Sequence, residues 1–332
     1  MKYVFIVNPE SAKGNAMKII GNIEKVCKKE KLEYEICYTL APGDATRLAQ
    51  SYKDQENIIY AVGGDGTLSE VLNGIVGTKN KLGIIPAGSG NDFYRTIKEL
   101  GKTEIKSDVG VINGKYFLNI ACVGIDAEVA NNVPLMKKKN IKIKNLYTAS
   151  IIYTFTHFKF KEIHFKSEEK DETNNFTILS ICNGRYYGGG YNISPKASLE
   201  DGTFEVYYTE KQKMPTIINL LLKLKKGKLE EDKRIQHFKT NKIQVTSKQP
   251  IRFNVDGETI ENTKFEIKII QNAVTIYHNA NLEKSFLSVR GRFLNWHFCQ
   301  LGDVSLTDKS VRWVTHLQQS KNKANYWNTS KI

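Results

Sequence analysis

The sequence predicts an α/β domain with a doubly wound, mainly parallel sheet over residues 1–120, followed by a β-rich antiparallel sandwich over residues 121–283. Two observations predict this division. The first part alternates short apolar runs with segments of helical spacing, which is typical of a parallel sheet with helices on its faces. The middle part carries many short alternating runs at close spacing, which are typical of a sandwich or barrel.

The elements of the first domain follow from their apolar spacing. Short runs of β-branched and aromatic residues predict strands, whereas Met17, Ile20 and Ile23 recur at the spacing of one helix face. These patterns predict strands at residues 3–7, 34–38, 58–62 and 82–85, and helices at residues 16–30, 45–52 and 68–75.

The elements of the second domain are also predicted from apolar spacing. A tail of residues 284–332 follows this domain. Alternating runs predict strands at residues 117–123, 162–165, 176–182, 202–208, 242–245, 251–255, 265–270 and 273–277, with helices at residues 146–158 and 214–224. Residues 284–332 are basic, contain all three tryptophans and show poor periodicity, so we expect a loosely ordered appended tail.

Composition excludes several classes of protein. The chain has 332 residues, of which 40% are apolar and 25% are charged, as in ordinary globular proteins and unlike collagen-like or wholly disordered chains. Uncharged apolar stretches fall far short of the roughly 20 residues of a membrane span, and the apolar start is too short for a secretory signal. Five scattered cysteines without a Cys-x-x-Cys pair predict free thiols in a cytoplasmic protein.

The chain is strongly basic, with 49 Lys and Arg against 35 Asp and Glu and a formal net charge of +14. Such a field favours anionic partners, although most of these lysines are expected to be ordinary solvated surface residues. The segment Lys137–Lys144 is a candidate membrane-docking face, with a solvated loop as the equally weighted alternative. No basic stripe with interleaved aromatic residues occurs, so nucleic acid is not an expected partner.

The strongest chemical signal is the glycine-rich segment Gly63-Gly64-Asp65-Gly66-Thr67, which follows a buried strand and opens a helix. Glycines let the backbone approach a ligand closely, and a helix N-terminus offers unpaired N–H groups that suit phosphate. Asp65 does not favour bare phosphate, so it implies a bridging Mg²⁺ or a hydrogen bond to ribose or to a water network. The hydroxyl of Thr67 can donate to a phosphate oxygen.

Two further loops repeat this pattern at strand ends, at residues 86–93 and 8–14. Loops at neighbouring strand ends of an open α/β sheet converge on one crevice. One such loop alone would indicate only a glycine turn, but three together favour a nucleotide site. Neither a Walker A motif nor a complete G-x-G-x-x-G occurs, which disfavours a P-loop NTPase and an ordinary NAD dehydrogenase.

These motifs resemble the diacylglycerol kinase catalytic-domain family, most closely its bacterial lipid kinase branch, to which sphingosine and ceramide kinases are related. The resemblance is carried by Asn8-Pro9 with Ser11 and Gly14, by residues 63–70 and by residues 86–93. Later landmarks include residues 197–202 and Asp256-Gly257-Glu258, so the resemblance spans about residues 1–283. The Gly-Gly-Asp-Gly core alone is shared with NAD kinases and phosphofructokinases.

The family implies a phosphofructokinase- or NAD-kinase-like nucleotide domain, with the active site in a cleft against the β-rich domain. Position 12 departs from the family's tighter form, which has glycine there. By similarity, ATP contacts are expected at Asn8, Pro9, Glu10, Ser11, Ala12, Thr39, Gly64, Asp65, Gly66, Thr67, Leu68, Ser69, Glu70, Ser89, Asn91 and Asp92.

The resemblance also assigns chemistry to the second domain. Asp256-Gly257-Glu258 would carry the base that takes the proton of the acceptor hydroxyl, with Glu258 favoured and Asp256 as the other candidate, while Asp65 completes the catalytic set. The alternative reading of this segment is a plain Asp-Gly hairpin turn. A structural Mg²⁺ loop is expected at Ser198, Asp201 and Thr203, with a solvated turn as its alternative.

Together these observations predict an ATP- and Mg²⁺-dependent lipid kinase that is cytoplasmic and peripherally membrane-associated. The simplest acceptor is diacylglycerol, which would become phosphatidic acid. Two alternatives stay open: a kinase of a soluble substrate, as in NAD kinases, and a catalytically silent module that binds nucleotide or lipid. The sequence fixes neither the acceptor lipid nor the oligomeric state, for which a homodimer is one option.

Overall fold

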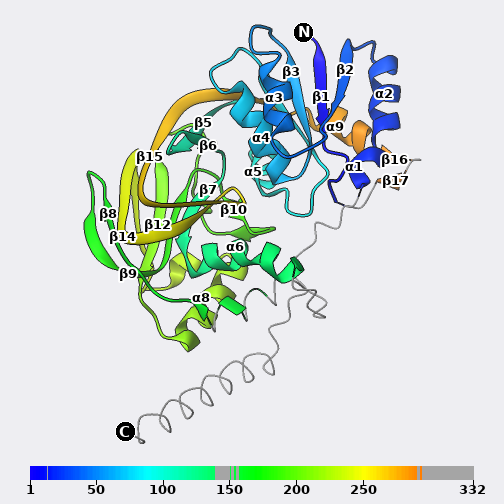
Figure 1. The fold of residues 1–332 in the computed structure, drawn as a ribbon. Helices are drawn as coiled ribbons and strands as arrows, with labels where there is room; N and C mark the ends of the chain where they lie inside the picture. Colours follow the sequence, from blue (N-terminus) through cyan, green and yellow to red (C-terminus); the bar gives the residue numbers. More distant parts are fainter. Residues whose placement is uncertain (13, 139–149, 151–152, 155–156, 290–291, 294–332) are drawn as a thin grey trace, which may run out of the picture.

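The computed structural model shows an α/β lobe and a β-rich lobe (Figure 1). It describes residues 1–332 except 13, 139–149, 151–152, 155–156, 290–291 and 294–332. Most of the lysine-rich segment, much of the predicted helix at residues 146–158 and nearly all of the tail therefore lie outside the described residues. Within the described part of the chain, no helix combines the length and the apolar character that a membrane span requires.

The first lobe is built on a parallel sheet in the order β2-β1-β3-β4, and the end of β15 joins it as the fifth strand. Its strands are β1 (Tyr3–Val7), β2 (Tyr34–Tyr38), β3 (Ile58–Gly63) and β4 (Lys81–Pro86). Its helices are α1 (Asn15–Lys18), α2 (Ile20–Lys29), α3 (Asp44–Gln50), α4 (Asp65–Ile75), α5 (Asp92–Leu100) and α9 (Ala280–Leu287).

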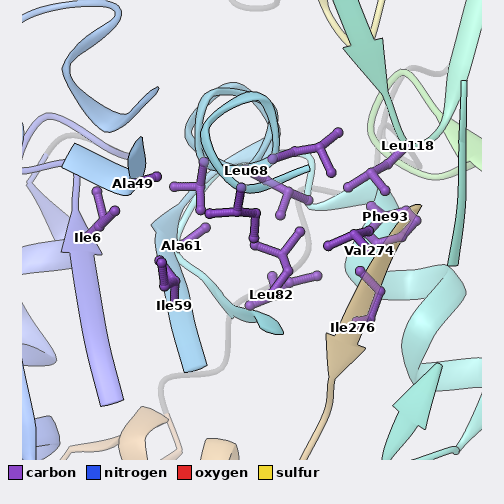
Figure 2. Close-up of a cluster of buried hydrophobic side chains, with 14 of the residues drawn as sticks. Ile6, Ala49, Ile59, Ala61, Leu68, Leu82, Phe93, Leu118, Val274 and Ile276 are labelled. Carbon is purple, nitrogen blue, oxygen red and sulfur yellow. The ribbon is translucent and has the colours of Figure 1, made fainter. Parts of the chain in front are cut away.

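Helices cover both faces of this sheet because its strands are apolar on both sides. In β1, Ile6 joins a buried cluster with side chains of α3, α4 and α5, shown in Figure 2. The neighbouring Phe5 points to the opposite cluster, where it packs with side chains of α1, α2 and α9. The carboxyl ends of β1, β3 and β4 are thereby left for loops, as in other open α/β sheets.

The second lobe is antiparallel, with β13, β12, β9, β7, β14, β15, β5 and β6 in spatial order and β8 paired with both β9 and β14. Phe165, Phe253 and Phe265 lie in its core. Its strands are β5 (Glu104–Ile112), β6 (Lys115–Phe117), β7 (Ile120–Gly124), β8 (Glu162–Lys166), β9 (Asp171–Cys182), β12 (Phe204–Glu210), β13 (Gln236–Thr240), β14 (Lys242–Val255) and β15 (Glu258–Tyr277).

Short elements complete the described chain. Two hairpins are formed by β10 (Tyr186–Tyr187) with β11 (Tyr191–Asn192), and by β16 (Ser288–Val289) with β17 (Arg292–Phe293). The remaining helices are α6 (Ile125–Lys138), α8 (Met214–Lys225) and the 3-10 helix η1 (Leu229–Glu231).

Strand β15 differs most from the prediction, which placed separate strands at residues 265–270 and 273–277 within the second domain. The structure shows one strand that pairs with β14 and β5 and then, at Thr275–Tyr277, runs parallel to β4 in the first lobe. A register shift beside Asn272, whose φ is 51°, lets the strand bend between the two lobes. Helix α9 then packs against α2, so the first lobe is completed by residues that follow the second.

Candidate active site

Three loops at the carboxyl ends of β1, β3 and β4 meet the β14–β15 turn of the other lobe around one cavity. We call it the interlobe cavity; its volume is about 350 Å³. It is lined by Asn8, Ser11, Ala12, Gly64, Asp65, Gly66, Thr67, Gly88, Ser89, Gly90, Asp256, Gly257 and Glu258. The three strand-end loops that the sequence singled out therefore converge, opposite the predicted Asp-Gly-Glu turn.

Two glycines allow the second and third loops to touch. A Cβ atom added at Gly88 would lie 2.3 Å from the Cα atom of Gly64, which no real side chain could tolerate. A Cβ atom at Gly90 would lie 2.6 Å from a carboxylate oxygen of Asp65. The glycines are thus required by the close approach of two loops, and this approach leaves backbone on the cavity wall.

Asp65 begins α4 and ties these two loops together. Its two carboxylate oxygens accept hydrogen bonds of 2.8 Å from the backbone N–H groups of Asn91 and Asp92. Loss of solvent around the carboxylate raises the pKa of Asp65, although these N–H groups work in the opposite direction. Asn91 has a left-handed φ of 54°, and its side-chain amide bonds both the N–H and the carbonyl of Gly88. Asn91 is therefore a structural part of the loop.

The first loop is fixed to the other two by two side chains. The amide of Asn8 donates to the hydroxyl of Thr67 at 3.2 Å, and the hydroxyl of Ser11 donates to the carbonyl of Ala87 at 3.0 Å. Ala12 lines the cavity with a left-handed φ of 46°, which explains why glycine suits this position in the family's tighter form. The departure at position 12 keeps the loop geometry at a small conformational cost.

Asp92 connects the nucleotide-side loops to the second lobe. One of its carboxylate oxygens accepts a 2.8 Å hydrogen bond from the N–H of Gly189, in the β10–β11 hairpin. Burial, together with the nearby charge of Asp65, raises the pKa of Asp92 to about 7. Arg95 lies on the same side, with its guanidinium 3.9 Å from the carboxylate.

Asp256 and Gly257 form a two-residue turn between β14 and β15, with φ values of 46° and 93°. The hairpin geometry offered as the alternative reading is therefore present, and the turn also lines the cavity. The carboxylate of Asp256 accepts backbone N–H groups from Leu118 at 2.7 Å, Asn119 at 3.1 Å and Ile120 at 2.9 Å.

The two carboxylates of this turn differ in environment. Asp256 is partly buried at the cavity wall, and desolvation of its carboxylate raises its pKa to about 6, with a further contribution from the charge of Asp65. Glu258 is 45% exposed at the cavity edge and forms an ion pair with Lys115 of β6. Asp256 thus holds the backbone of the turn, while the carboxylate of Glu258 is the more exposed of the two to a ligand that enters from solvent.

Several residues of the predicted nucleotide set lie off the cavity wall. Leu68 is part of the apolar core and Ser69 is buried beside it. The carboxylate of Glu70 accepts the N–H of Ala45 at 3.1 Å and so joins α4 to the start of α3. These three side chains lie away from the cavity because only the first turn of a helix faces the loops at its N-terminus.

Three other predicted positions lie in or near the first loop but are not part of the cavity lining. Pro9 and Glu10 complete the loop between Asn8 and Ser11, and the N–H of Glu10 donates to the side chain of Asn8 at 3.0 Å. Thr39 follows β2, where its N–H donates to the carbonyl of Val7 at 3.0 Å. Their roles in nucleotide contact stay predictions.

The predicted Mg²⁺ loop at Ser198, Asp201 and Thr203 lies elsewhere in the second lobe. Asp201 accepts the N–H of Thr203 at 3.1 Å, and its other oxygen lies 3.1 Å from the ammonium of Lys239. Among the described residues, no group of three or more His, Cys, Asp or Glu side chains is arranged to hold a metal. A loop of one carboxylate and two backbone carbonyls is a different kind of site, so the Mg²⁺ site at Ser198, Asp201 and Thr203 stays a prediction.

A second cavity of about 370 Å³ opens beside α6, and we call it the α6 cavity. Its apolar lining includes Val123, Ile163, Phe176 and Ile251, while Lys159 and Lys161 also border it. Ile251 lies on β14, five residues before Asp256, so the two cavities are roughly 16 Å apart along one strand. The sequence patterns predicted these strands but not the hollow that they share with α6.

Functional candidates missed by the sequence patterns lie in the segment Lys115–Ile120. Its backbone N–H groups hold Asp256, and its Lys115 pairs with Glu258. These contacts join residues more than 130 positions apart, so no local pattern could have revealed them.

Comparison with known proteins gives matches over most of the chain. The family model of the diacylglycerol kinase catalytic domain matches residues 2–122, and that of the YegS C-terminal NAD kinase beta sandwich-like domain matches residues 119–278. The chain is 28% identical to the diacylglycerol kinase of Bacillus subtilis (strain 168), covering 76% of this chain and 88% of the relative. It is 29% identical to a probable lipid kinase YegS-like of Alcanivorax borkumensis, covering 74% and 87%.

Solved structures share the fold. Two crystal structures from Bacillus anthracis str. Sterne match with TM-scores of 0.67 at 24% identity and 0.59 at 22% identity; the second is titled as a diacylglycerol kinase. Each alignment covers 85% of this chain, and 96% and 98% of the respective structures. The predicted fold class, an α/β domain followed by a β sandwich, is confirmed. The chain belongs to the diacylglycerol kinase catalytic-domain family, in its bacterial lipid kinase branch.

Proposed function

We propose that this lipid kinase transfers the γ-phosphate of ATP to the hydroxyl of a lipid, with diacylglycerol as the simplest acceptor and phosphatidic acid as the product. The single observation that supports this is the shared cavity. Glycine loops and a helix N-terminus face two carboxylates of the opposite lobe across one space of about 350 Å³. Phosphoryl transfer needs this pairing of a phosphate cradle with a base.

The nucleotide side suits a triphosphate. Backbone of the Gly64 and Gly88 loops forms the wall, and the N-terminal N–H groups of α4 point to the same place. Desolvation raises the pKa values of both Asp65 and Asp256, and the charge of Asp65 adds to the shift of Asp256; a cation between phosphate and carboxylate relieves such repulsion. We propose Asp65 as the residue that holds Mg²⁺ there; when bound, the ion supplies neutralisation of the phosphate charge.

On the acceptor side we propose Glu258 as the general base. Its carboxylate takes the proton of the lipid hydroxyl while the hydroxyl oxygen bonds to the γ-phosphorus. The bond from that phosphorus to the β–γ bridging oxygen breaks, and ADP leaves. Asp256 fixes the turn that presents Glu258, since three backbone N–H groups hold its carboxylate.

We propose the α6 cavity as the place for the acyl part of the acceptor. Its apolar lining suits hydrocarbon, and β14 connects it with the turn that carries the proposed base. Lys159 and Lys161 border this cavity, and ammonium groups there would attract an anionic leaflet. We therefore propose peripheral contact with the cytoplasmic membrane face at this side of the second lobe.

The test is transfer of labelled phosphate from ATP to a panel of lipids in mixed micelles with Mg²⁺. We expect labelled phosphatidic acid from diacylglycerol and a loss of kcat of about 10²–10⁴-fold in Glu258→Gln, because a positioned general base contributes about that factor. Thermal unfolding of this variant should match that of the wild type, since Glu258 is half-exposed.

The same assay decides between the proposal and its alternatives. Phosphorylation of NAD without any lipid product would contradict the proposal and favour a soluble-substrate kinase. Binding of ATP with no turnover on any acceptor would indicate a silent module. An equal activity of Glu258→Gln and the wild type would remove Glu258 as the base, and Asp256→Asn would then be the variant to compare.

A further inference from the structure

One short segment holds both carboxylates that face the phosphate loops. The backbone N–H groups of Leu118, Asn119 and Ile120 bind the carboxylate of Asp256. Three residues before Leu118, the ammonium of Lys115 pairs with the carboxylate that we propose as the base. Backbone N–H groups thus fix the carboxylate of Asp256, and a flexible side chain contacts the more exposed carboxylate of Glu258.

This segment is itself fixed to the helix that begins at the phosphate site. Asn73 of α4 accepts the N–H of Tyr116 at 3.0 Å, and its amide donates to the carbonyl of Tyr116 at 3.1 Å. The same amide donates to the carbonyl of Ser69 at 2.8 Å, one turn back in α4. The neighbour of Tyr116 is Lys115, so its backbone is held at a set distance from the first turn of α4.

The charge around the cavity gives Lys115 particular weight. Among the described residues, no lysine or arginine lines the interlobe cavity. Three carboxylates do line it, those of Asp65, Asp256 and Glu258. The ammonium of Lys115 reaches its edge through contact with Glu258. A half-exposed glutamate without a partner samples several rotamers, and a charged hydrogen bond restricts them.

We propose that Lys115 is the positioning residue for Glu258, holding its carboxylate at the cavity edge where the acceptor hydroxyl arrives. This inference rests on the proposed function, because it gives Glu258 the task of taking the acceptor proton. The contribution comes from orientation, and a misplacement of about 1 Å at a reacting group can cost about 10²-fold in rate.

The first experiment compares Lys115→Met with Lys115→Arg in the lipid phosphorylation assay. Methionine keeps most of the apolar stem and removes the ammonium, so we expect kcat to fall about 10- to 100-fold with the KM for ATP changed less than 2-fold. Arginine restores a donor to Glu258, and we expect it to recover at least about a third of the wild-type kcat.

Lys81→Met is the matched control. Lys81 pairs with Glu104, and the side chains of this pair are 21% and 48% exposed, against 26% and 45% for Lys115 and Glu258. The Lys81 pair lies outside the cavity lining, so kcat and KM should stay within 2-fold of the wild type. A kcat of Lys115→Met within 2-fold of the wild type, or an equal fall in both methionine variants, would overturn the inference.

A second experiment needs no kinase activity. A water-soluble carbodiimide condenses a carboxylate with an adjacent amine and forms an amide without a spacer, while the carbodiimide takes up the lost water as a urea. We expect a Lys115–Glu258 cross-linked peptide by mass spectrometry in the wild type, and its loss in Glu258→Gln. Absence of this peptide from folded wild-type protein would overturn the inference, even where lipid kinase activity is present.

These two readouts separate the inference from the proposed function. Wild-type protein that yields the cross-link but phosphorylates no lipid would refute the proposed function, and with it the role of Lys115 in positioning a base. Active wild-type protein without the cross-link, or with an unaffected Lys115→Met variant, would refute the inference alone.

Discussion

Three aspartates, Asp65, Asp92 and Asp256, lie around the phosphate loops, and each has a raised pKa. Burial is the largest cause for all three, and the charge of Asp65 adds to the shift of the other two. The fold therefore holds these three carboxylates near the phosphate loops, in surroundings that disfavour their ionised forms. Such arrangements are concentrated at functional sites, although structural networks also produce them.

The raised pKa of Asp92 should make the free energy of unfolding depend on pH. Its pKa is raised from 3.8 to about 7, so between these values the folded chain binds more protons at this site than the unfolded chain. The contribution of Asp92 to stability is therefore present below about pH 4 and is lost as the pH rises toward and through 7. We expect Asp92→Asn, which keeps an acceptor for Gly189, to gain stability relative to the wild type on going from pH 5 to pH 8.

The measurement is the urea midpoint of both proteins at the two pH values. The difference between variant and wild type should grow in favour of the variant as the pH rises. Parallel pH profiles would contradict the raised pKa of Asp92, because removal of a titrating group must change the profile.

At the residue scale, sequence patterns identified the groups whose neighbours are local. Asp65 and the strand-end glycines stand where a helix N-terminus follows a buried strand, and that pattern is visible in a short window. Lys115 carries no such signal, because its partner Glu258 lies 143 positions away. The three N–H donors to Asp256 are backbone groups and leave no trace in side-chain chemistry.

Among the elements, the loops after β3 and β4 depend on each other through a backbone contact. A methyl group at Gly88 would lie 2.3 Å from the Cα atom of Gly64, so Gly88→Ala must push the loops apart. We expect a loss of about 1–3 kcal/mol in the free energy of unfolding, typical of overpacking, and a higher KM for ATP.

Gly21→Ala in α2 is the control for this substitution. A Cβ atom there would meet nothing within 4 Å, so alanine should be neutral or stabilise the helix by about 0.5–1 kcal/mol. Urea unfolding and ATP kinetics of both variants are the measurements. A Gly88→Ala protein with wild-type stability and KM would show that the two loops are not in contact.

Element prediction succeeded where periodicity and burial agree. Strands β1, β2 and β3 were expected within one residue of their observed ends because they are short, apolar and bounded by turns. Helix α5 was not expected, since its start at Asp92 was read as part of a loop. The end of β15 was expected only within the second domain, but it also pairs in parallel with β4 of the first lobe, because an apolar run does not indicate which strands it will pair with.

For the whole molecule, the first lobe depends on the end of the described chain. Phe286 of α9 packs at 5.5 Å from the ring of Phe5 and at 5.9 Å from that of Tyr60. The end of β15 covers the edge of β4 that would otherwise be exposed. We expect a fragment of residues 1–120 to be unfolded or aggregated, whereas residues 1–289 should unfold in a cooperative transition.

Circular dichroism and size-exclusion chromatography of the two fragments check this expectation. A soluble, monomeric fragment 1–120 with native helical content would show that the return of the chain is dispensable. The sequence-based division at residue 120 would then describe an autonomous folding unit after all.

The continuous course of β15 limits how the enzyme can move. At about 3.4 Å per residue, its 20 residues extend over roughly 65 Å, and hydrogen bonds anchor both halves. The two lobes are therefore not joined by a flexible linker at this strand. A change in the angle between them would have to bend β15, and the register shift near Asn272 is where it bends most easily. Strand β5 runs beside β15 across the same place, so any change in the angle between the lobes would have to bend both paired strands.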